Sequence, residues 1–299
     1  MTPRTQHTFD DPTTRYPKIE PPEQQQPEPG TDEHLDPVPD IGETSYVGSG
    51  RLSGRRALIT GGDSGIGAAV AIAFAREGAD VAISYLPDEQ ADAERIGALI
   101  GAAGRTAALL PGDLTDAAYC RQLVADTVER LGGLDLLVVN AGKQRYTERL
   151  EDLSDEQFDQ TMKVNVYAMF HLIKAALPEL PAGSTIITTT SLEAYKPAPI
   201  LLDYAMTKAA INNFTKGLAQ QLAPRGIRVN AVAPGPVWTV LQVSGGQPLE
   251  KIPHFGESTP LGRAGQPAEL APAYVFLASS ESSFVAGETL NVNGGQPTP

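Results

Sequence analysis

Short apolar runs alternate with longer amphipathic stretches from Arg51 onward. The runs are rich in β-branched residues, and apolar positions recur at helical spacing between them. This alternation is typical of βαβ units, in which helices connect the strands of a parallel sheet. We therefore predict strands at 56–60, 79–85, 105–110, 134–140, 184–190, 226–232 and 288–293, with helices between them.

Two segments depart from this alternation. Segment 234–266 is rich in Pro and Gly and too long for an ordinary connection, so we interpret it as an active-site lid that contacts substrate. Residues 1–50 hold nine prolines and ten acidic against three basic residues, which is too polar for a core of their own. They form either a disordered acidic tail or an arm draped over the domain or over a neighbouring subunit. The apolar residues Ile41, Tyr46 and Val47 leave the second alternative open.

Charge and composition narrow the classes of function. The net charge of -13, from 23 basic and 36 acidic residues, argues against nucleic acid or anionic lipid as a partner. Cys120 is the only cysteine, so no internal disulfide forms, and the four histidines show no metal-ligand spacing. The N-terminus has no apolar signal region, and no segment has the apolar length of a membrane span. We expect a cytoplasmic protein without a metal centre.

A glycine-rich turn, TGGDSGIG at 60–67, follows the first predicted strand and precedes a predicted helix. Glycines at 61, 65 and 67 allow a tight turn and bring backbone N–H groups and the helix N-terminus against a pyrophosphate. A purely structural turn is the alternative, but the strand before and the helix after favour dinucleotide binding and a Rossmann-type sheet. The spacing G-x-x-x-G-x-G differs from the more common G-x-G-x-x-G.

Tyr204 and Lys208 lie four residues apart in an Ala-rich predicted helix, so their side chains share one face. A free phenol has a pKa near 10, too high for proton exchange at neutral pH. An ammonium at ~4 Å and an effective dielectric of ~20 lowers that pKa by roughly three units. We therefore expect Tyr204 to be a general acid/base whose pKa Lys208 lowers. A half-buried core phenol beside a snorkelling lysine is the alternative.

From about 51 to 295 the chain resembles the short-chain dehydrogenase/reductase family. The elements that match the family, in the family's order, are TGGDSGIG, Asp113-Leu114, Asn140-Ala141-Gly142, Asn165, Ser191, Tyr204 with Lys208, and Pro234-Gly235-Pro236-Val237 with Thr239. The resemblance implies a dinucleotide-binding catalytic domain at 51–299. It also implies a catalytic set of Asn165, Ser191, Tyr204 and Lys208.

The resemblance gives each member of this set a role. Ser191 follows a strand at the ligand edge of the sheet and is expected to hold the substrate oxygen, although it also suits a loop cap. Asn165 lies inside a predicted helix, where Asn is a poor helix former, and is expected to support a water-linked proton relay. A purely structural role, which would need a buried backbone partner, is the alternative. Lys208 is expected to bind the nicotinamide ribose as well as to act on Tyr204.

NAD or NADP is the expected cofactor. The expected contacts are Gly61, Asp63, Ser64, Gly65, Ile66, Gly67, Ser84, Tyr85, Asp113, Leu114, Asn140, Ala141, Gly142, Tyr204, Lys208, Pro234, Gly235, Val237 and Thr239. Asp113 equally suits a turn or helix cap. Stretch 84–89 has neither the strand-end Asp of NAD-preferring relatives nor the basic residues of NADP-preferring ones, so the choice stays open.

Residues near the expected pocket bear on the substrate. Glu193, Tyr195 and Lys196 lie on one side and Lys143, Gln144 and Arg145 on the other, as a solvated rim or as a polar pocket wall. Trp238 is expected to line the pocket or to pack in the lid.

The expected function is hydride transfer between nicotinamide and a small-molecule carbonyl or alcohol, namely an aldehyde, a ketone or a sugar-like compound. A catalytically silent dinucleotide-sensing regulator is the alternative, and a scaffold whose tail recruits partners is a third possibility. The resemblance also implies a homotetramer joined through helices at 154–180 and 202–223.

Overall fold

A computed structural model describes residues 4–298 of the 299-residue chain. Seven strands form one parallel sheet in the order β3-β2-β1-β4-β5-β6-β7. The strands are β1 Arg56–Thr60, β2 Asp80–Tyr85, β3 Ala107–Pro111, β4 Leu136–Val139, β5 Thr185–Thr189, β6 Arg228–Pro234 and β7 Thr289–Val292. The predicted α/β fold and its seven-stranded parallel sheet are confirmed.

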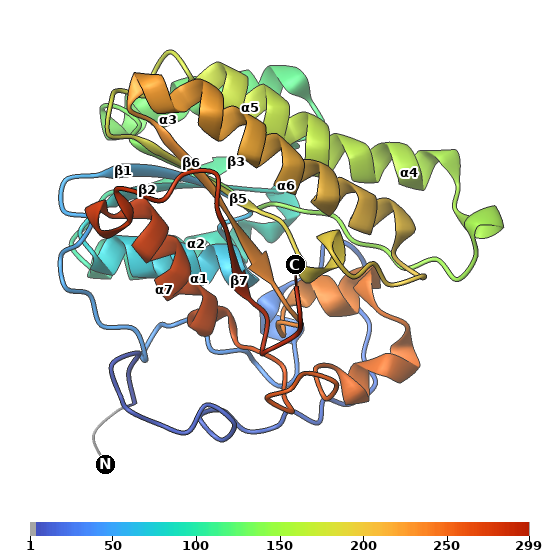
Figure 1. The fold of residues 1–299 in the computed structure, drawn as a ribbon. Helices are drawn as coiled ribbons and strands as arrows, with labels where there is room; N and C mark the ends of the chain where they lie inside the picture. Colours follow the sequence, from blue (N-terminus) through green and yellow to red (C-terminus); the bar gives the residue numbers. More distant parts are fainter. Residues whose placement is uncertain (1–3, 299) are drawn as a thin grey trace.

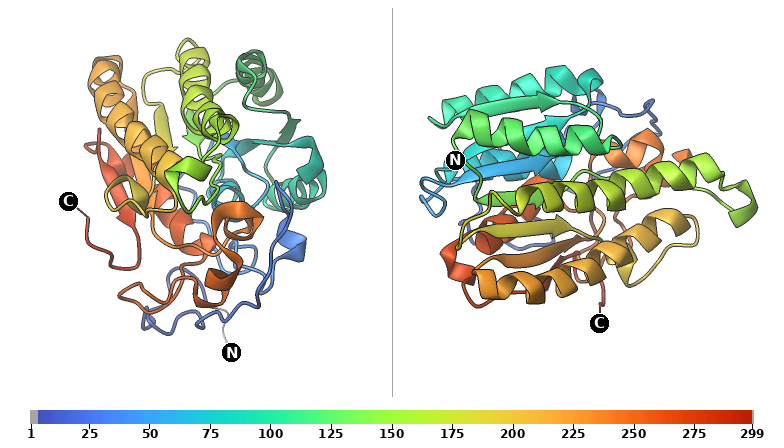
Figure 2. Two further views of the ribbon diagram at one scale, coloured as in Figure 1. Left: turned by 90° about the vertical axis from the view of Figure 1, so that its right-hand side faces the viewer. Right: turned by 90° about the horizontal axis from the view of Figure 1, so that it is seen from above.

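Helices cover both faces of the sheet (Figure 1). One face carries α1 Gly65–Arg76, α2 Gln90–Ala102 and α7 Pro267–Ala278; the other carries α3 Ala117–Leu131, α4 Asp155–Met162, α5 Ala168–Ala176 and α6 Leu202–Leu222. In Figure 2, α4 and α5 run as one long rod beside α6. Because all connections are crossovers between parallel strands, the carboxyl ends of the strands meet at one edge.

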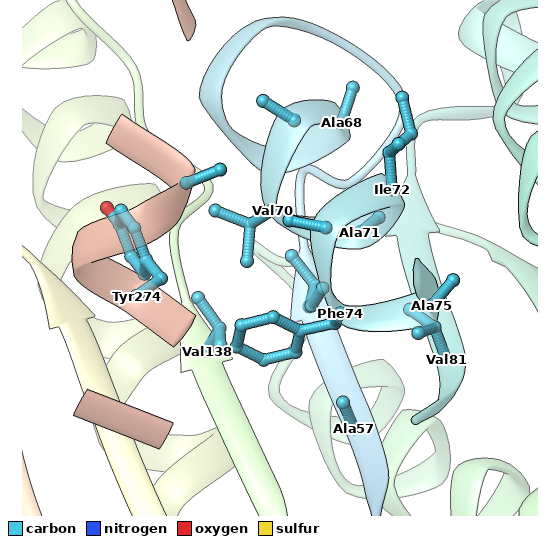
Figure 3. Packing of buried hydrophobic residues seen from close by; sticks show 14 of the residues in the cluster. Ala57, Ala68, Val70, Ala71, Ile72, Phe74, Ala75, Val81, Val138 and Tyr274 are labelled. Carbon is cyan, nitrogen blue, oxygen red and sulfur yellow. The ribbon is translucent and has the colours of Figure 1, made fainter. Parts of the chain in front are cut away.

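Helix α1 is apolar around its whole circumference, with nearly every residue buried. Figure 3 shows why: Val70 and Phe74 point toward β4 and α7, where Val138 and Tyr274 meet them. A helix that contacts the sheet on one side and neighbouring helices on the others has no solvent face, so it carries no polar stripe. This packing fixes the N-terminus of α1 at the edge where β1 ends.

The order of the strands puts a topological switch point beside β1. β1 pairs with β2 on one side and with β4 on the other. From β1 the chain adds β2 and β3 toward one edge of the sheet, and then β4 to β7 toward the opposite edge. Open α/β sheets bind ligands in the crevice outside the strand ends at such a point.

Part of the N-terminal segment 4–50 packs against the rest of the chain, as the draped-arm alternative expects. Ile19 and Leu35 pack in a hydrophobic cluster with Trp238, whose indole N–H donates to Pro37 O at 2.7 Å. Ile41 and Tyr46 also join a core cluster, whereas Val47 is exposed. Figure 1 shows this arm in blue beneath the body and beside the orange segment before α7.

Segment 234–266 contains two short helical turns, η7 Gln242–Gly246 and η8 Leu249–His254. Trp238, near its start, is fully buried and packs against the arm, not in the pocket. The lid-packing alternative for this residue is therefore correct. Within residues 4–298, no helix combines the length and apolarity that crossing a membrane requires. The division of the chain at residue 50 and the lid function of 234–266 stay predictions.

Candidate active site

A cleft of about 590 Å³ lies along the carboxyl ends of the strands. It brings together almost all the residues that the sequence nominated. Those that line it are Gly61, Asp63, Ser64, Gly65, Ile66, Ser84, Tyr85, Asp113, Leu114, Asn140, Ala141, Gly142, Ser191, Tyr204, Lys208, Pro234, Gly235, Val237 and Thr239. Gly67 and Asn165 do not line the cleft. Gly67 lies in the first turn of α1, and Asn165 lies between α4 and α5.

The glycine-rich turn needs its glycines for two reasons. Gly61 and Gly65 have φ of 61° and 50°, a left-handed conformation that other residues adopt at a cost. Gly67 touches the turn itself, because a Cβ there would lie 1.8 Å from Gly61 O. Helix α1 then begins without an acidic residue in its first turn and without a side-chain cap from Ser64. Of its first amides, Gly65 N–H donates to Asp32 Oδ2 at 3.5 Å, and those of Ile66 and Gly67 remain available to an anion.

Hydrogen bonds fasten the loop after β4 to the glycine-rich turn. The Thr60 hydroxyl accepts from the Asn140 and Ala141 N–H groups at 3.0 and 3.1 Å. Asn140 Nδ2 donates to Thr60 O and Gly61 O, each at 3.2 Å. Thr60 thus holds two sides of the cleft together. No separate signal in the sequence points to this role, because Thr is common at the end of a strand.

Tyr204 and Lys208 share one face of α6, as the four-residue spacing predicts. Tyr204 is 7% exposed and Lys208 3% exposed. Lys208 Nζ lies 5.3 Å from the centroid of the Tyr204 ring and donates to Thr189 O at 2.9 Å. A Cβ on Gly142 would come within 3.5 Å of Lys208 Nζ, so a small residue at 142 leaves the ammonium open to the cleft.

The expected lowering of the Tyr204 pKa by Lys208 is wrong for this structure. Burial raises the pKa of the Tyr204 phenol well above its usual value, and the Ser191 hydroxyl offsets this only in part. Burial also lowers the pKa of Lys208 to about 8. Desolvation is thus the main cause of both pKa changes, and Lys208 donates to a backbone carbonyl, Thr189 O.

Asn165 lies in a π-helical turn, η4 Lys163–Tyr167, between α4 and α5. The sequence predicted an uninterrupted helix here, and such single π turns occur frequently at functional sites. Asn165 Oδ1 accepts from Lys143 N–H at 2.7 Å, and its Nδ2 donates to Lys143 O and to Thr207 Oγ1 at 2.9 and 3.0 Å. The poor helix former thus has the buried backbone partner that a structural account requires.

Asp203 is a buried residue of this site that the sequence motifs did not include. Its Oδ1 accepts from Tyr204 N–H at 2.9 Å, and its Oδ2 accepts from the Thr161 hydroxyl at 2.7 Å. It ties the first turn of α6 to α4, and a carboxylate in a first helical turn is favoured by the helix dipole. The sequence feature that could have identified Asp203 is its position directly before Tyr204.

Ser191 and Asp113 each have a local structural role as well as a place in the cleft wall. The Ser191 hydroxyl caps a short 3-10 turn by accepting from Glu193 N–H at 3.1 Å. The Asp113 carboxylate accepts from Thr115 N–H at 2.8 Å. The capping alternatives are therefore correct, and they coexist with exposure to the cleft.

The polar residues that flank the pocket divide into two groups. Glu193, Lys143 and Gln144 line the cleft. The cleft wall does not include Tyr195, Lys196 or Arg145. Burial raises the pKa of Glu193, whose carboxylate accepts from Ala198 N–H at 2.6 Å.

Comparison with known proteins assigns the family. The family model described as Enoyl-(Acyl carrier protein) reductase matches residues 61–296. The uncharacterized oxidoreductase YhxD of Bacillus subtilis (strain 168) is 60% identical over 280 residues, covering 93% of this chain and 94% of that protein. A short-chain dehydrogenase/reductase from Brucella melitensis, described as a glucose/ribitol dehydrogenase, superposes with a TM-score of 0.76 at 34% identity, over 83% of this chain and 99% of that one. This chain is a short-chain dehydrogenase/reductase.

Short-chain dehydrogenases/reductases are NAD(P)-dependent oxidoreductases, and this chain shares that class. A family member from Burkholderia cenocepacia, solved in complex with NADP, superposes with a TM-score of 0.74 at 36% identity, over 82% of this chain and 98% of that one. The match covers almost all of the Burkholderia chain, so that chain has no unmatched segment as long as the N-terminal arm of this one.

The cleft fits a dinucleotide in its chemistry. Two buried side-chain oxygens in its wall, Asp63 Oδ2 and Ser84 Oγ, have no hydrogen-bond partner within residues 4–298. The residues of the first turn of α1 and the pair formed by Tyr204 and Lys208 line the same cleft. A ligand with a polar ribose, a pyrophosphate and a second ribose meets matching groups along the cleft.

Proposed function

We propose that this chain transfers a hydride between a nicotinamide cofactor and a carbonyl or alcohol substrate, with Tyr204 as the general acid/base. The observation that carries the proposal is the meeting of Ser191, Tyr204 and Lys208 in the same cleft as the glycine-rich turn. Geometry of this kind is the first requirement for a general acid/base, ahead of its pKa.

The proposed roles of the cofactor contacts follow the cleft wall from one end to the other. The turn at 61–67 and the α1 N-terminus hold the pyrophosphate, and Ser84, Tyr85, Asp113 and Leu114 hold the adenosine. Asn140–Gly142, Lys208 and the residues 234–239 hold the nicotinamide ribose and carboxamide. When bound, the nicotinamide carries the hydride, while the protein supplies orientation and a proton.

Tyr204 acts first as an acid in this proposal. Since its pKa is raised, the phenol holds its proton at neutral pH and can donate it to a carbonyl oxygen that Ser191 holds. Lys208, with a pKa of about 8, is largely an ammonium at pH 7 and donates to ribose hydroxyls. Oxidation of an alcohol would need the phenolate, which accepts the proton of the alcohol in the reverse step.

Asn165 has a positioning role. It does not line the cleft, and it holds the backbone of Lys143 on both its N–H and its C=O. Thr207 links Asn165 to Tyr204, because its hydroxyl accepts from Asn165 and donates to Tyr204 O at 2.6 Å. A proton relay through water at this point remains our proposal, on the strength of the family resemblance.

The substrate end of the cleft favours a polar carbonyl compound. Glu193, Lys143, Gln144 and Gln247 contribute charged or amide groups to its wall. Hydrogen-bonding side chains of this kind suit a hydroxylated aldehyde, ketone or sugar. The Brucella relative, described as a glucose/ribitol dehydrogenase, agrees with that substrate class.

A silent dinucleotide sensor is the alternative, and it needs the cofactor end of the cleft alone. It gives no reason for the buried phenol and ammonium beside Ser191. Burying an ionisable group without function costs free energy, so the catalytic interpretation is the better one.

We also propose a homotetramer. Five exposed aromatic or aliphatic side chains lie on α4, η4, α5 and α6, the helices that the family resemblance assigns to subunit contacts: Phe158, Tyr167, Phe170, Leu202 and Met206, each between 40% and 48% exposed. Gathered apolar side chains on a surface often mark an interface.

The test of the enzyme proposal is a substrate panel. Oxidation of NADH and of NADPH is followed in parallel over aldehydes, ketones and open-chain or cyclic sugars, at pH 7. We expect cofactor oxidation with at least one polar carbonyl compound. Tight cofactor binding without turnover across the whole panel would favour the sensor.

A further inference from the structure

The N-terminal arm contributes a charged side chain to the wall of the cleft. Glu28 and Pro29 line the cleft, together with residues from the loop after β4 and from segment 234–266. Within the described part of the arm, 4–50, these two are the residues that do so. The Glu28 carboxylate forms an ion pair with the ammonium of Lys143, which lies 115 residues further along the chain.

Hydrogen bonding and close packing hold the arm in this place. Gln26 N–H donates to Val243 O at 3.0 Å. Gly30, with a φ of 76°, lies so close to segment 234–266 that a Cβ there would be 2.6 Å from Val240 Cγ2. The backbone of the arm is thus anchored on both sides of Glu28, so this side chain projects from a positioned stretch of chain.

The loop after β4 holds Lys143 just as firmly. Its N–H donates to Asn165 Oδ1 at 2.7 Å, and its C=O accepts from Asn165 Nδ2 at 2.9 Å. Lys143 directly follows Gly142, where a Cβ would come within 3.5 Å of Lys208 Nζ. The Lys143 side chain therefore starts beside the proposed catalytic groups and ends at the Glu28 carboxylate.

Lys143 is the cation that a negatively charged substrate would meet. Among the described residues that line the cleft, the lysines are Lys143 and Lys208, and none is an arginine. Lys208 donates to Thr189 O and is the proposed partner of the nicotinamide ribose. The side chains of Lys143 and Glu28 are 23% and 39% exposed, so both are accessible to a ligand. Because the two are paired, the positive charge of Lys143 is already balanced.

We propose that Glu28 is a specificity-determining residue, which makes the site select neutral hydroxylated carbonyl compounds, or their alcohols, and reject those that carry a carboxylate or a phosphate. This proposal rests on the proposed function and adds the charge class of the substrate. A carboxylate accepts hydrogen bonds and an ammonium donates them, so the pair offers both kinds of partner to a substrate hydroxyl. A substrate anion would have to displace Glu28 from Lys143 and would face a like charge.

The experiment compares two matched probes, sorbitol and gluconate. They share one carbon chain and differ at one end, where gluconate has a carboxylate in place of a hydroxymethyl group, and neither is reduced by the cofactor. Their dissociation constants for the full chain are measured by ligand-observed NMR titration at pH 7.5, with the more tightly bound of NADH and NADPH present. We expect the wild type to bind sorbitol, and to bind gluconate about 10-fold more weakly.

Two variants test the pair. In Glu28→Gln, which keeps the size and removes the charge, gluconate should bind about 10-fold more tightly because Lys143 is free to pair with it. Sorbitol affinity should change by less than about 3-fold, since an amide oxygen still accepts from a hydroxyl. When Lys143→Gln is added to Glu28→Gln, the gain for gluconate should disappear.

Glu33→Gln is the matched control, since Glu33 is an exposed residue of the same arm that does not line the cleft, and both affinities stay as in the wild type. Equal affinities for the two probes in the wild type would overturn the proposal. An unchanged ratio in Glu28→Gln, a gain that persists without Lys143, or a failure of both probes to bind the wild type and Glu28→Gln would overturn it as well.

Binding of these probes requires no turnover, so this proposal and the proposed function fail separately. An enzyme that reduces members of the substrate panel but binds both probes equally refutes the role of Glu28 alone. The expected affinity ratios in a chain that reduces nothing refute hydride transfer alone.

Discussion

Tyr204 and Lys208 stand one helical turn apart on α6, and both are almost fully buried. Their sequence spacing predicts that the two side chains lie on the same face of the helix, but it does not predict how completely they are buried from solvent. Burial raises the pKa of the phenol and lowers that of the ammonium. The charge of Lys208 therefore depends on pH close to neutrality, which a surface lysine would not show.

The first prediction concerns Lys208. Its pKa of about 8 in the unliganded protein means that the ammonium is lost as the pH rises through 8. If bound ribose hydroxyls favour the ammonium, NADH affinity falls above pH 8 and is constant below it. Titrations from pH 6.5 to 9.5 check this. Lys208→Arg, which stays charged, should bind more weakly but without this pH dependence. A wild-type affinity that is flat across the range would contradict the prediction.

A second prediction concerns Asp32. Its pKa of about 6 lies above the ordinary 3.8, so the folded state keeps a proton that the unfolded state has lost between these pH values. The stability contributed by this group is present below pH 4 and is lost as the pH rises through 6. Asp32→Asn should therefore raise the melting temperature of the unliganded protein more at pH 8 than at pH 4.5.

Thermal unfolding at both pH values, with Glu33→Gln as the control, measures this difference. The groups that face Asp32 are Asp92 and Arg95 from α2, Asp63 and Gly65 N from the turn, and Glu89 from the 3-10 turn η2 Pro87–Glu89. An equal effect of Asp32→Asn at the two pH values would show that Arg95 neutralises Asp32 completely.

The N-terminal arm is the element for which the sequence was least informative. Its composition is that of a disordered segment, yet it buries Ile19 and Leu35 against Trp238. It also bonds segment 234–266, where Gln26 N–H donates to Val243 O at 3.0 Å. Glu28 forms an ion pair with Lys143 in the wall of the cleft. Such a segment has no core of its own and gains its order from a surface elsewhere in the chain, which no local pattern reveals.

The third prediction tests the packing of the arm. Leu35→Ala should reduce the free energy of unfolding by about 2–5 kcal/mol, as for other buried leucines. Val38→Ala, three residues along at a 69% exposed position, should change it by at most about 0.5 kcal/mol. Denaturant unfolding followed by the fluorescence of Trp238, the single tryptophan, reports on this cluster directly. Equal effects of the two substitutions would mean that the arm does not pack there.

The strands were the elements best predicted from the sequence. The predicted 56–60 coincides with β1, and the other strands differ by one or more residues at their ends. Strands buried on both faces read as continuous apolar runs, as in Leu136–Val139, so the signal is strong. The π turn around Asn165 could not be predicted from the pattern of apolar residues. It inserts one extra residue into a helical turn, and Asn165 is held there by hydrogen bonds to Lys143 and Thr207.

At the scale of the whole molecule, the sheet gathers at one edge the residues that lie at or after the ends of β1 to β6, and α6 adds Tyr204 and Lys208. Most motifs located the cleft because they follow strands, and parallel strands end together. The sequence motifs assigned no role to Thr60, the first residue of the glycine-rich motif, to Asp203 or to the arm residue Asp32. Their roles depend on contacts across the sheet or between helices, and the sequence has no periodic signal for such contacts.

The fourth prediction concerns assembly. Phe170→Glu places a charge in the exposed apolar patch of α5 and should convert the proposed tetramer into smaller species. Phe284→Glu alters a fully exposed aromatic outside that patch and should leave the assembly unchanged. Light scattering after size-exclusion chromatography gives the mass of each variant. A wild-type monomer, or a tetramer in both variants, would contradict the proposed interface.

The central claim is that the Tyr204 phenol supplies the proton in a hydride-transfer reaction, and Tyr204→Phe tests it most directly. The substitution removes one oxygen and keeps the ring against Lys208. With the best substrate of the panel, we predict that kcat falls by about 10²- to 10⁴-fold while cofactor affinity is nearly unchanged. A variant that keeps its kcat, with its cofactor affinity intact, would contradict the account.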